Sequence, residues 1–244
     1  MHDALGERMK SQYEHRARYF LPRRTYTIVR VDGKAFHSYT RGCERPFDAC
    51  LIADMNSTAV ALCEQLQGSQ WAYVQSDEIS VLLTDFDRIT TEAWFDGNVQ
   101  KMASIAAATA TAEFNAVRRA MPGSRHRAMF DARVFTIPDP VEVENYFVWR
   151  QQDATRNSIQ MVAQTLYSQK ELHGKNVNEQ QEMIFARGIN WNDYPEGCKR
   201  GRVIAYRETR WQIEEPPVFT QDRAYLAALV PRGGAAAATE GSAS

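Results

Sequence analysis

Three acidic side chains stand where short apolar runs of the sequence end. Asp32 precedes Gly33 after a β-branched run, and Asp77 and Glu78 follow Ser76 between two short apolar runs. Carboxylate oxygens suit Mg²⁺, which keeps several waters and is usually completed by substrate phosphates. Two such ions stabilise the attacking and leaving oxygens in phosphoryl or nucleotidyl transfer. Each motif alone is also typical of a plain turn or a solvated hairpin tip, so the metal hypothesis depends on the two motifs converging.

The residues that follow Asp32 are suited to holding phosphate. Gly33 lets the backbone approach a phosphate where a side chain would obstruct it. Lys34 offers charge, Phe36 offers packing, and His37 offers a hydrogen-bond donor. A lone histidine is equally often a structural hydrogen-bonding group, and that alternative stays open for His37.

The elements that must position these residues follow the order strand, helix, strand, strand, helix, strand. Strands are predicted at residues 25–31, 71–75, 79–83 and 132–137, and helices at residues 48–66 and 92–119. This is the ferredoxin-like βαββαβ pattern, in which the first strand and the hairpin are neighbours. We therefore expect an α+β fold in which Asp32 and Asp77 converge. We also expect the hairpin acids to be exposed, and helices to cover one face of an antiparallel sheet while the other stays free for a site.

Further elements are expected on either side of this core. Helices are predicted at residues 3–20, 142–173 (with a possible break) and 179–187, and a last strand at residues 202–206. The residues after Pro231 are too poor in large apolar groups to join a core.

Composition excludes several classes of protein. The 244 residues are 44% hydrophobic and 24% charged, as in an ordinary folded protein, and the net charge of -1 means that a polyanionic partner needs local basic patches. Cys43, Cys50, Cys63 and Cys198 match neither a zinc knuckle nor a disulfide framework. No apolar run approaches the roughly 20 residues that span a bilayer. The first residues lack the apolar centre of a secretory signal, so we expect a cytoplasmic protein without a membrane partner.

Several motifs together resemble the tRNA(His) guanylyltransferase family. They are VRVDGKAFH at residues 29–37, RPFD at 45–48, QSDE at 75–78, FDAR at 130–133 and YFVWRQQD at 146–153. The blocks occur in the family's order with compatible spacing, and the resemblance extends over residues 5–206.

This resemblance implies a polymerase-palm domain that adds nucleotides to the 5′ end of tRNA, so that growth runs from 3′ to 5′. The cofactors would be two Mg²⁺ ions, with ATP and GTP as substrates. In the family, the tRNA 5′-monophosphate is adenylylated, and the 3′-hydroxyl of an incoming nucleoside triphosphate then attacks the activated phosphate. The resemblance also implies a homotetramer. Residues 1–136 would form the catalytic domain with its N-terminal helix, residues 137–230 a helical extension and closing strand packed on it, and residues 231–244 a disordered tail.

The resemblance assigns roles position by position. The catalytic acids are Asp32, Asp77 and Glu78, and the metal ligands are Asp32, the Gly33 backbone and Asp77. The nucleotide-binding residues are Gly33, Lys34, Ala35, Phe36, His37, Arg45, Asp48 and Ser76. The residues that serve the tRNA end or its phosphates are Arg30, Lys101, Arg133, Arg150 and Asn157.

The sequence departs from the family pattern at two places. Eukaryotic members carry His-Ile-Asn-Asn where this chain has TRNS at residues 155–158, so the histidine associated with the tRNA(His) anticodon is replaced by Thr155. The chain therefore resembles the bacterial and archaeal Thg1-like branch, which repairs truncated tRNA 5′ ends with a template. The second departure is Ala132, which replaces the glycine of the family's Phe-Asp-Gly-Arg.

Two other functions are compatible with parts of the pattern. A palm-domain nucleotide cyclase also uses two carboxylates on this scaffold, but the block at residues 146–153 argues against it. A catalytically silent RNA-binding module would not need Asp32, Asp77 and Glu78 intact.

Overall fold

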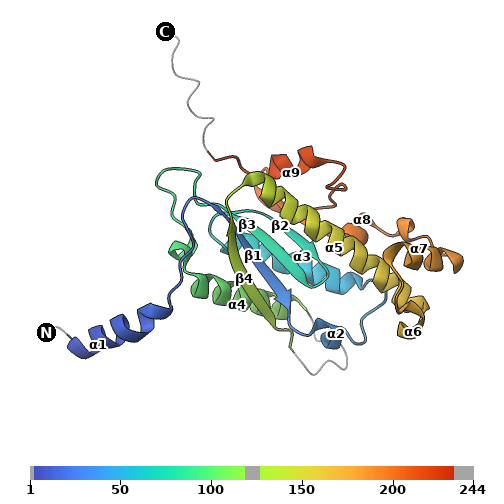
Figure 1. Ribbon diagram of the computed structural model, residues 1–244, viewed down its shortest axis with the longest axis horizontal. Coiled ribbons are helices and arrows are strands. Elements are labelled where there is room, and N and C mark those ends of the chain that lie inside the picture. Colours follow the sequence, from blue (N-terminus) through green and yellow to red (C-terminus); the bar gives the residue numbers. More distant parts are fainter. Residues whose placement is uncertain (1–2, 119–126, 234–244) are drawn as a thin grey trace, which may run out of the picture.

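The computed structural model describes residues 3–118 and 127–233, and these residues form a six-stranded antiparallel sheet with helices on both faces (Figure 1). The strands are β1 (Tyr26–Gly33), β2 (Ser69–Gln75), β3 (Glu78–Leu83), β4 (Phe130–Ile137), β5 (Arg202–Arg207) and β6 (Arg210–Glu214). Their order is β4-β1-β3-β2-β5-β6. The first four strands have the ferredoxin-like order, so the predicted α+β fold is confirmed.

The first face of the sheet is covered by α3 (Ala49–Gln65) and α4 (Val99–Val117). Successive residues of a strand point to opposite faces, and Val29 and Val31 of β1 pack on this side with Val81 of β3. Both helices start where the sequence supplies a cap: the carboxylate of Asp48 accepts the Leu51 N–H at 2.8 Å, and Asn98 caps α4.

The second face is covered by α5 (Pro140–Leu166) and α9 (Arg223–Leu229), so the prediction of a free face is wrong. Tyr26, Ile28 and Trp71 point to this side, and the rings of Trp71 and Phe147 lie 4.0 Å apart. The physical reason is visible in β3, all six residues of which are buried. Strands that are apolar on both sides need cover on both faces.

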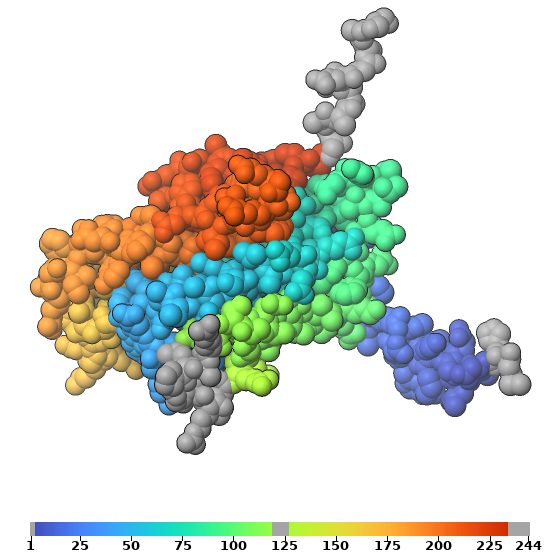
Figure 2. All heavy atoms as spheres, turned by 180° about the vertical axis from the view of Figure 1, so that it is seen from behind, coloured from blue at the N-terminus to red at the C-terminus, as the bar shows by residue number. Residues whose placement is uncertain are grey.

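The other elements are short and lie at the ends of the sheet or beyond them. They are α2 (Phe36–Tyr39), η3 (Trp94–Gly97), α6 (Gln169–Leu172), α7 (Val177–Ala186), η4 (Trp191–Asp193) and α8 (Glu196–Arg200). The N-terminal helix expected at residues 3–20 is α1 (Ala4–Met9), which continues as η1 (Lys10–Glu14) and η2 (His15–Ala17). Figures 1 and 2 show that this segment projects away from the body of the protein.

Other differences from the prediction concern the C-terminal half. The helix expected at residues 142–173 breaks after α5, and neither β6 nor α9 was expected. The tail expected at residues 231–244 lies, from residue 234 onward, outside the described residues. Within residues 3–118 and 127–233, no helix is both long and apolar enough to cross a membrane.

Candidate active site

Strand pairing brings Asp32 and Asp77 together at one end of the sheet. β1 pairs with β3 so that Asp32 lies opposite Glu78, the first residue after the β2–β3 turn. The Gly33 N–H donates to the Asp77 carbonyl at 3.1 Å, which ties the end of β1 to that turn. On the other side of β1, Asp131 of β4 is paired with Asp32. Three strands therefore place their carboxylates at the same end of the sheet.

The two predicted metal ligands repel each other and are partly removed from water. Burial and the negative charge of Asp32 raise the pKa of Asp77 to about 6. Burial and the charge of Asp131 raise the pKa of Asp32, although Arg133 opposes the shift. A divalent cation placed between these carboxylates would relieve the repulsion.

The oxygen ligands at this end of the sheet suit a Mg²⁺ ion whose coordination is completed by substrate phosphates. In the described part of the chain, no group of three or more His, Cys, Asp or Glu side chains is arranged to hold a metal ion. Asp32 and Asp77, with the backbone of Gly33, supply only a few oxygen ligands. Mg²⁺ is usually bound by one or two carboxylates and completed by water and substrate phosphates, so the residues present fit this cation.

A cavity of about 500 Å³ is lined by Asp77 and by Gly33, the residue that follows Asp32. It is lined by Gly33, Ala35, Phe36, His37, Thr40, Cys43, Glu44, Arg45, Pro46, Asp48, Leu51, Ser76, Asp77, Met161 and Gln164. The structure thus brings together all the predicted nucleotide-binding residues except Lys34. The Lys34 side chain is exposed, and its backbone N–H donates to the Met129 carbonyl at 2.8 Å. The volume is in the range of small-molecule and cofactor sites.

The backbone around this cavity is held in unusual conformations. Ala35 and Ser76 both adopt positive φ values, 55° and 46°, although neither is a glycine. A Cβ on Gly33 would lie 2.3 Å from the Phe36 ring, so only glycine fits there. Phe36 itself is buried against Phe114 and Phe130, which means that its ring anchors the loop in the core.

Asp48 forms part of the cavity wall and is already engaged as a helix cap. Its two carboxylate oxygens accept the N–H groups of Leu51 and Glu44, at 2.8 Å and 3.0 Å. Burial raises the pKa of Asp48, but these two hydrogen bonds, together with the charge of Arg118 and a hydrogen bond from Cys43, outweigh it and the pKa is lowered. Arg45, in the segment just before the helix, is exposed and free to meet a phosphate at the cavity mouth.

Glu78 is placed differently from the prediction. The hairpin acids were expected to be exposed, but Glu78 is buried and Asp77 is half-buried, because β3 starts at Glu78 and turns its side chain toward α5. The Arg150 guanidinium donates to both Glu78 carboxylate oxygens, at 2.8 Å and 2.7 Å, and to Asp153 at 2.8 Å. Glu78 is therefore fully engaged, and Arg150 is only 5% exposed, which leaves it little surface from which to contact RNA.

The remaining predicted RNA-binding residues are scattered. Arg30 and Arg133 are paired across β1 and β4, and the Arg133 side chain is 56% exposed, 3.9 Å from Asp32. Asn157 lies on α5 next to Asp153. Lys101 lies in the first turn of α4, at the opposite end of the sheet, where its ammonium group stacks over the Phe95 ring. The structure does not bring Lys101 to the two aspartates.

Sequence reasoning missed the contribution of α5 to the cavity. Met161 and Gln164 line it, and Asn157 lines the adjoining space. The three residues are spaced by four and three positions, which places them on one helix face, so this spacing was a usable signal.

Comparison with known proteins agrees with this geometry. A family model described as tRNAHis guanylyltransferase matches residues 6–138. A bacterial tRNA(His) guanylyltransferase-like protein solved with ATP has a TM-score of 0.89 and 44% identity, covering 94% of this chain and 100% of that chain. A second structure, described as a bacterial protein of this kind with GTP, has a TM-score of 0.80 and 42% identity over 94% of this chain and 100% of that chain. The tRNA(His) guanylyltransferase of Debaryomyces hansenii is 31% identical over 221 residues, which are 80% of each protein. The chain belongs to the tRNA(His) guanylyltransferase family.

Proposed function

We propose that this chain is a Mg²⁺-dependent nucleotidyltransferase that adds nucleotides to the 5′ end of tRNA in the 3′ to 5′ direction. The observation that carries the proposal is the meeting of Asp32 and Asp77 beside a cavity of about 500 Å³. Membership of the family supports tRNA as the substrate. The similar bacterial proteins bind ATP and GTP, which supports nucleoside triphosphates as the second substrate.

Different residues would bind the metal ion, the triphosphate and the 5′ end of the tRNA. Asp32, Asp77 and the Gly33 carbonyl would hold Mg²⁺, which stabilises negative charge on the attacking and leaving oxygens when bound. The backbone around Ala35 and the exposed Arg45 face the cavity and hold the triphosphate. Arg133, beside Asp32, attracts the 5′ phosphate of the tRNA.

The choice of tRNA depends on Thr155. Its hydroxyl donates to the Gln151 carbonyl at 2.9 Å, one turn back along α5, so it is not directed at a base. Threonine is also too short to stack on a base as a histidine can. We therefore expect little preference for the tRNA(His) anticodon and template-matched repair of several 5′-truncated tRNAs.

The test offers full-length and 5′-truncated tRNAs, each with one labelled nucleoside triphosphate and Mg²⁺, to the wild-type protein and to Asp77→Asn. Metal-dependent label on the 5′ end, absent with the variant, is the expected result. Turnover of nucleotide without tRNA would indicate a cyclase instead, and tRNA binding without turnover would indicate a silent RNA-binding module. A strong preference for the tRNA(His) anticodon, with indifference to the opposing base, would refute the repair assignment.

We also propose that the enzyme is a homotetramer in the cytoplasm, where its tRNA substrate would be processed. Leu5, Met9 and Tyr13 recur every four residues on the projecting N-terminal segment and are exposed, which supports contact with another copy. Residues 1–136 would act as the palm-like unit and residues 137–230 as its extension, consistent with β5 pairing directly with β2. Mass measurement by light scattering, with and without serine at those three positions, tests the assembly.

A further inference from the structure

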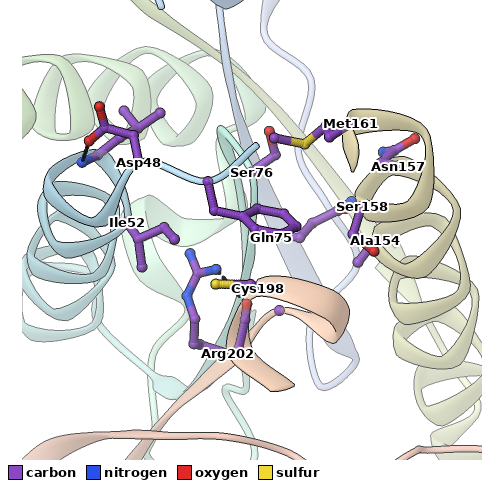
Figure 3. A pocket seen from close by; sticks show the side chains of 14 residues that line it. Asp48, Ile52, Gln75, Ser76, Ala154, Asn157, Ser158, Met161, Cys198 and Arg202 are labelled. Carbon is purple, nitrogen blue, oxygen red and sulfur yellow. Dashed lines mark hydrogen bonds between the residues drawn. The ribbon is translucent and has the colours of Figure 1, made fainter. Parts of the chain in front are cut away.

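The long helix α5 carries a large aromatic ring on its solvent side. Trp149 is 47% exposed, whereas the nearby Tyr146 and Phe147 are buried in the core on the second face of the sheet. Figure 3 shows Ala154 and Met161 on the side of α5 that faces the smaller cavity next to the nucleotide cavity. Trp149 precedes Ala154 by five positions, which is about 140° around a helix of roughly 3.6 residues per turn. The Trp149 ring therefore belongs to a different surface from the nucleotide cavity.

The Trp149 ring is held in place by its neighbours on α5. The Arg150 guanidinium lies 4.4 Å from the centroid of the ring, and the Tyr146 ring packs against it at 5.9 Å between centroids. Arg150 is itself fixed by hydrogen bonds to Glu78 and Asp153. A ring that is already held in one position loses little conformational freedom when a flat group stacks on its exposed part.

Two arginines of the sheet lie on the same face as α5. Arg30 and Arg133 are directly opposite each other on β1 and β4, so their side chains point to the same side. This is the second face, because Ile28, two residues before Arg30, packs there. The side chains of Arg133 and Asp32 are 56% and 40% exposed, so α5 leaves both accessible. Figure 1 shows that α5 starts near the end of β4 and diverges from this strand toward the end of the sheet where β1 finishes.

Tyr146 links these two arginines to Trp149. The Tyr146 ring lies 5.7 Å from the ring of Phe135 on β4, and its hydroxyl oxygen lies 2.9 Å from Oγ of Ser80, which is opposite Arg30 on β3. Trp149 follows Tyr146 by three positions, so the two are neighbours on the surface of the helix. We refer to Trp149 and the two arginines as the Trp149 strip.

An exposed tryptophan ring near two guanidinium groups suits an unpaired RNA base and the phosphates beside it. Every base has a flat face that can stack on an aromatic ring, and such stacking tolerates any sequence. Arginine contacts to phosphate fix the position of a strand. The two positive charges favour a polyanion over the apolar surface of another protein chain.

The position of the strip selects the part of the RNA. Arg133 lies 3.9 Å from Asp32, so RNA bound here is close to the reacting 5′ end. The bases of the 5′ strand are paired and stacked within the acceptor stem. The opposite strand of tRNA continues as an unpaired 3′ overhang, and loss of 5′ nucleotides lengthens that overhang. Unpaired bases are the usual targets of aromatic side chains in RNA recognition.

We propose that Trp149 stacks on an unpaired base of the tRNA 3′ overhang, with Arg30 and Arg133 holding phosphates of the same tRNA end. Trp149 is then a substrate-binding residue that fixes the strand opposite the 5′ end, as template-matched addition requires. This inference rests on the proposed function, since it takes tRNA to be the substrate.

The test measures the binding of labelled RNA hairpins by fluorescence anisotropy, without nucleoside triphosphate. Each hairpin has a 5′ phosphate and a short 3′ overhang, which either carries its bases or is abasic, so that both RNAs have the same charge on the backbone. We expect the wild-type protein to bind the overhang with bases about ten-fold more tightly than the abasic one. Trp149→Ala should reduce this preference to about two-fold or less by weakening only the RNA with bases, and Trp149→Phe should retain most of it. Phe185→Ala, which removes an exposed ring on α7 outside the strip, is the matched control and should retain the preference in full.

Equal binding of the two hairpins by the wild-type protein would overturn the inference, and this arm does not depend on any variant folding. An unchanged preference in folded Trp149→Ala, or an equal loss of affinity for both hairpins, would overturn it as well. A lower molecular mass of Trp149→Ala in light scattering would instead place the ring between copies of the chain, which also contradicts stacking on RNA. In each of these cases, nucleotide addition to 5′-truncated tRNA would still support the proposed function. If the wild-type protein binds neither the hairpins nor tRNA, both the inference and the proposed function are refuted.

Discussion

Arg150→Met separates a structural role of this arginine from a role in RNA binding. The substitution keeps an unbranched apolar stem and removes the guanidinium that holds Glu78 and Asp153. The side chains of Arg150 and Glu78 are 6% and 11% exposed, so Glu78 would remain buried opposite Asp32 without its cation.

The size of the effect follows from this burial. Removing one partner of a buried ion pair costs about 3–5 kcal/mol, because the other charge is left without compensation. Three hydrogen bonds of 2.7–2.8 Å are lost with the guanidinium. The double variant Glu78→Gln with Arg150→Met removes both charges of the pair. A double-mutant cycle built from this variant and the two single variants should give a coupling energy of about 0.5–3 kcal/mol.

Urea unfolding and tRNA binding, measured on the same preparations, test this reasoning. We expect Arg150→Met to lower the free energy of unfolding by the amount above and to leave the tRNA affinity of the folded protein within about two-fold, since Arg150 is buried. The control is Arg133→Met, which is 56% exposed and should lose tRNA affinity with little change in stability. Wild-type stability of Arg150→Met, combined with a loss of tRNA affinity like that of Arg133→Met, would refute the structural role.

Other predictions concern the metal site and the loop after β1. Asp32→Asn and Asp77→Asn should each abolish nucleotide addition without lowering the unfolding midpoint of the metal-free protein, since each removes a carboxylate whose charged form is disfavoured in the fold, and near-normal turnover by either folded variant would contradict the metal assignment. Because the pKa of Asp77 is raised from 3.8 to about 6, Mg²⁺ must displace a proton at low pH, so calorimetry should show affinity about ten-fold weaker at pH 5 than at pH 7; a flat profile would argue that Asp77 is not a ligand. In the metal-free protein, the folded state binds the Asp77 proton more tightly than the unfolded state does, because the pKa is raised on folding. This stabilises the fold fully below about pH 4, and the stabilisation is lost as the pH rises through about 6. Gly33→Ala should cost about 1–3 kcal/mol, since its Cβ would meet the Phe36 ring at 2.3 Å, and a wild-type melting temperature would show that the ring moves aside at little cost.

The sequence was sufficient to predict the strands that position the site but not the elements that depend on distant partners. β1 and the β2–β3 hairpin are marked by β-branched and aromatic runs, and turn residues bound them. β6 has only five residues, two of them charged, and pairs with β5 alone, so its strand character comes from the sheet edge that it joins. α9 spans seven residues, too short for helical periodicity to separate it from a loop.

The candidate site also combines features that the sequence predicts with features that it does not predict. The approach of Asp32 to Asp77 follows from topology, because the first strand and the hairpin are neighbours in a βαββαβ sheet. The partner of Glu78 does not follow, since Arg150 is 72 residues away and nothing local indicates which arginine reaches a buried carboxylate. The same topology places Lys101 far from the acids, because the strand that starts at Glu78 runs away from them and the next helix starts beyond its other end, so the assignment of Lys101 by resemblance conflicts with the predicted fold.

α5 explains why a sheet covered on both faces still has an active site. Near its start, Phe147 packs on the strands and closes the second face. One turn further on, Arg150 is tied to Glu78 at the end of β3, and by Met161 the same helix has passed beyond the strands and lines the cavity. The site therefore lies where the strand ends, the β2–β3 turn and the second half of α5 meet, and not on an open face. The helix that covers the face expected to be free is the one that fixes Glu78 and lines the nucleotide cavity, so changes that loosen α5 should disturb the position of the acids before they disturb the sheet.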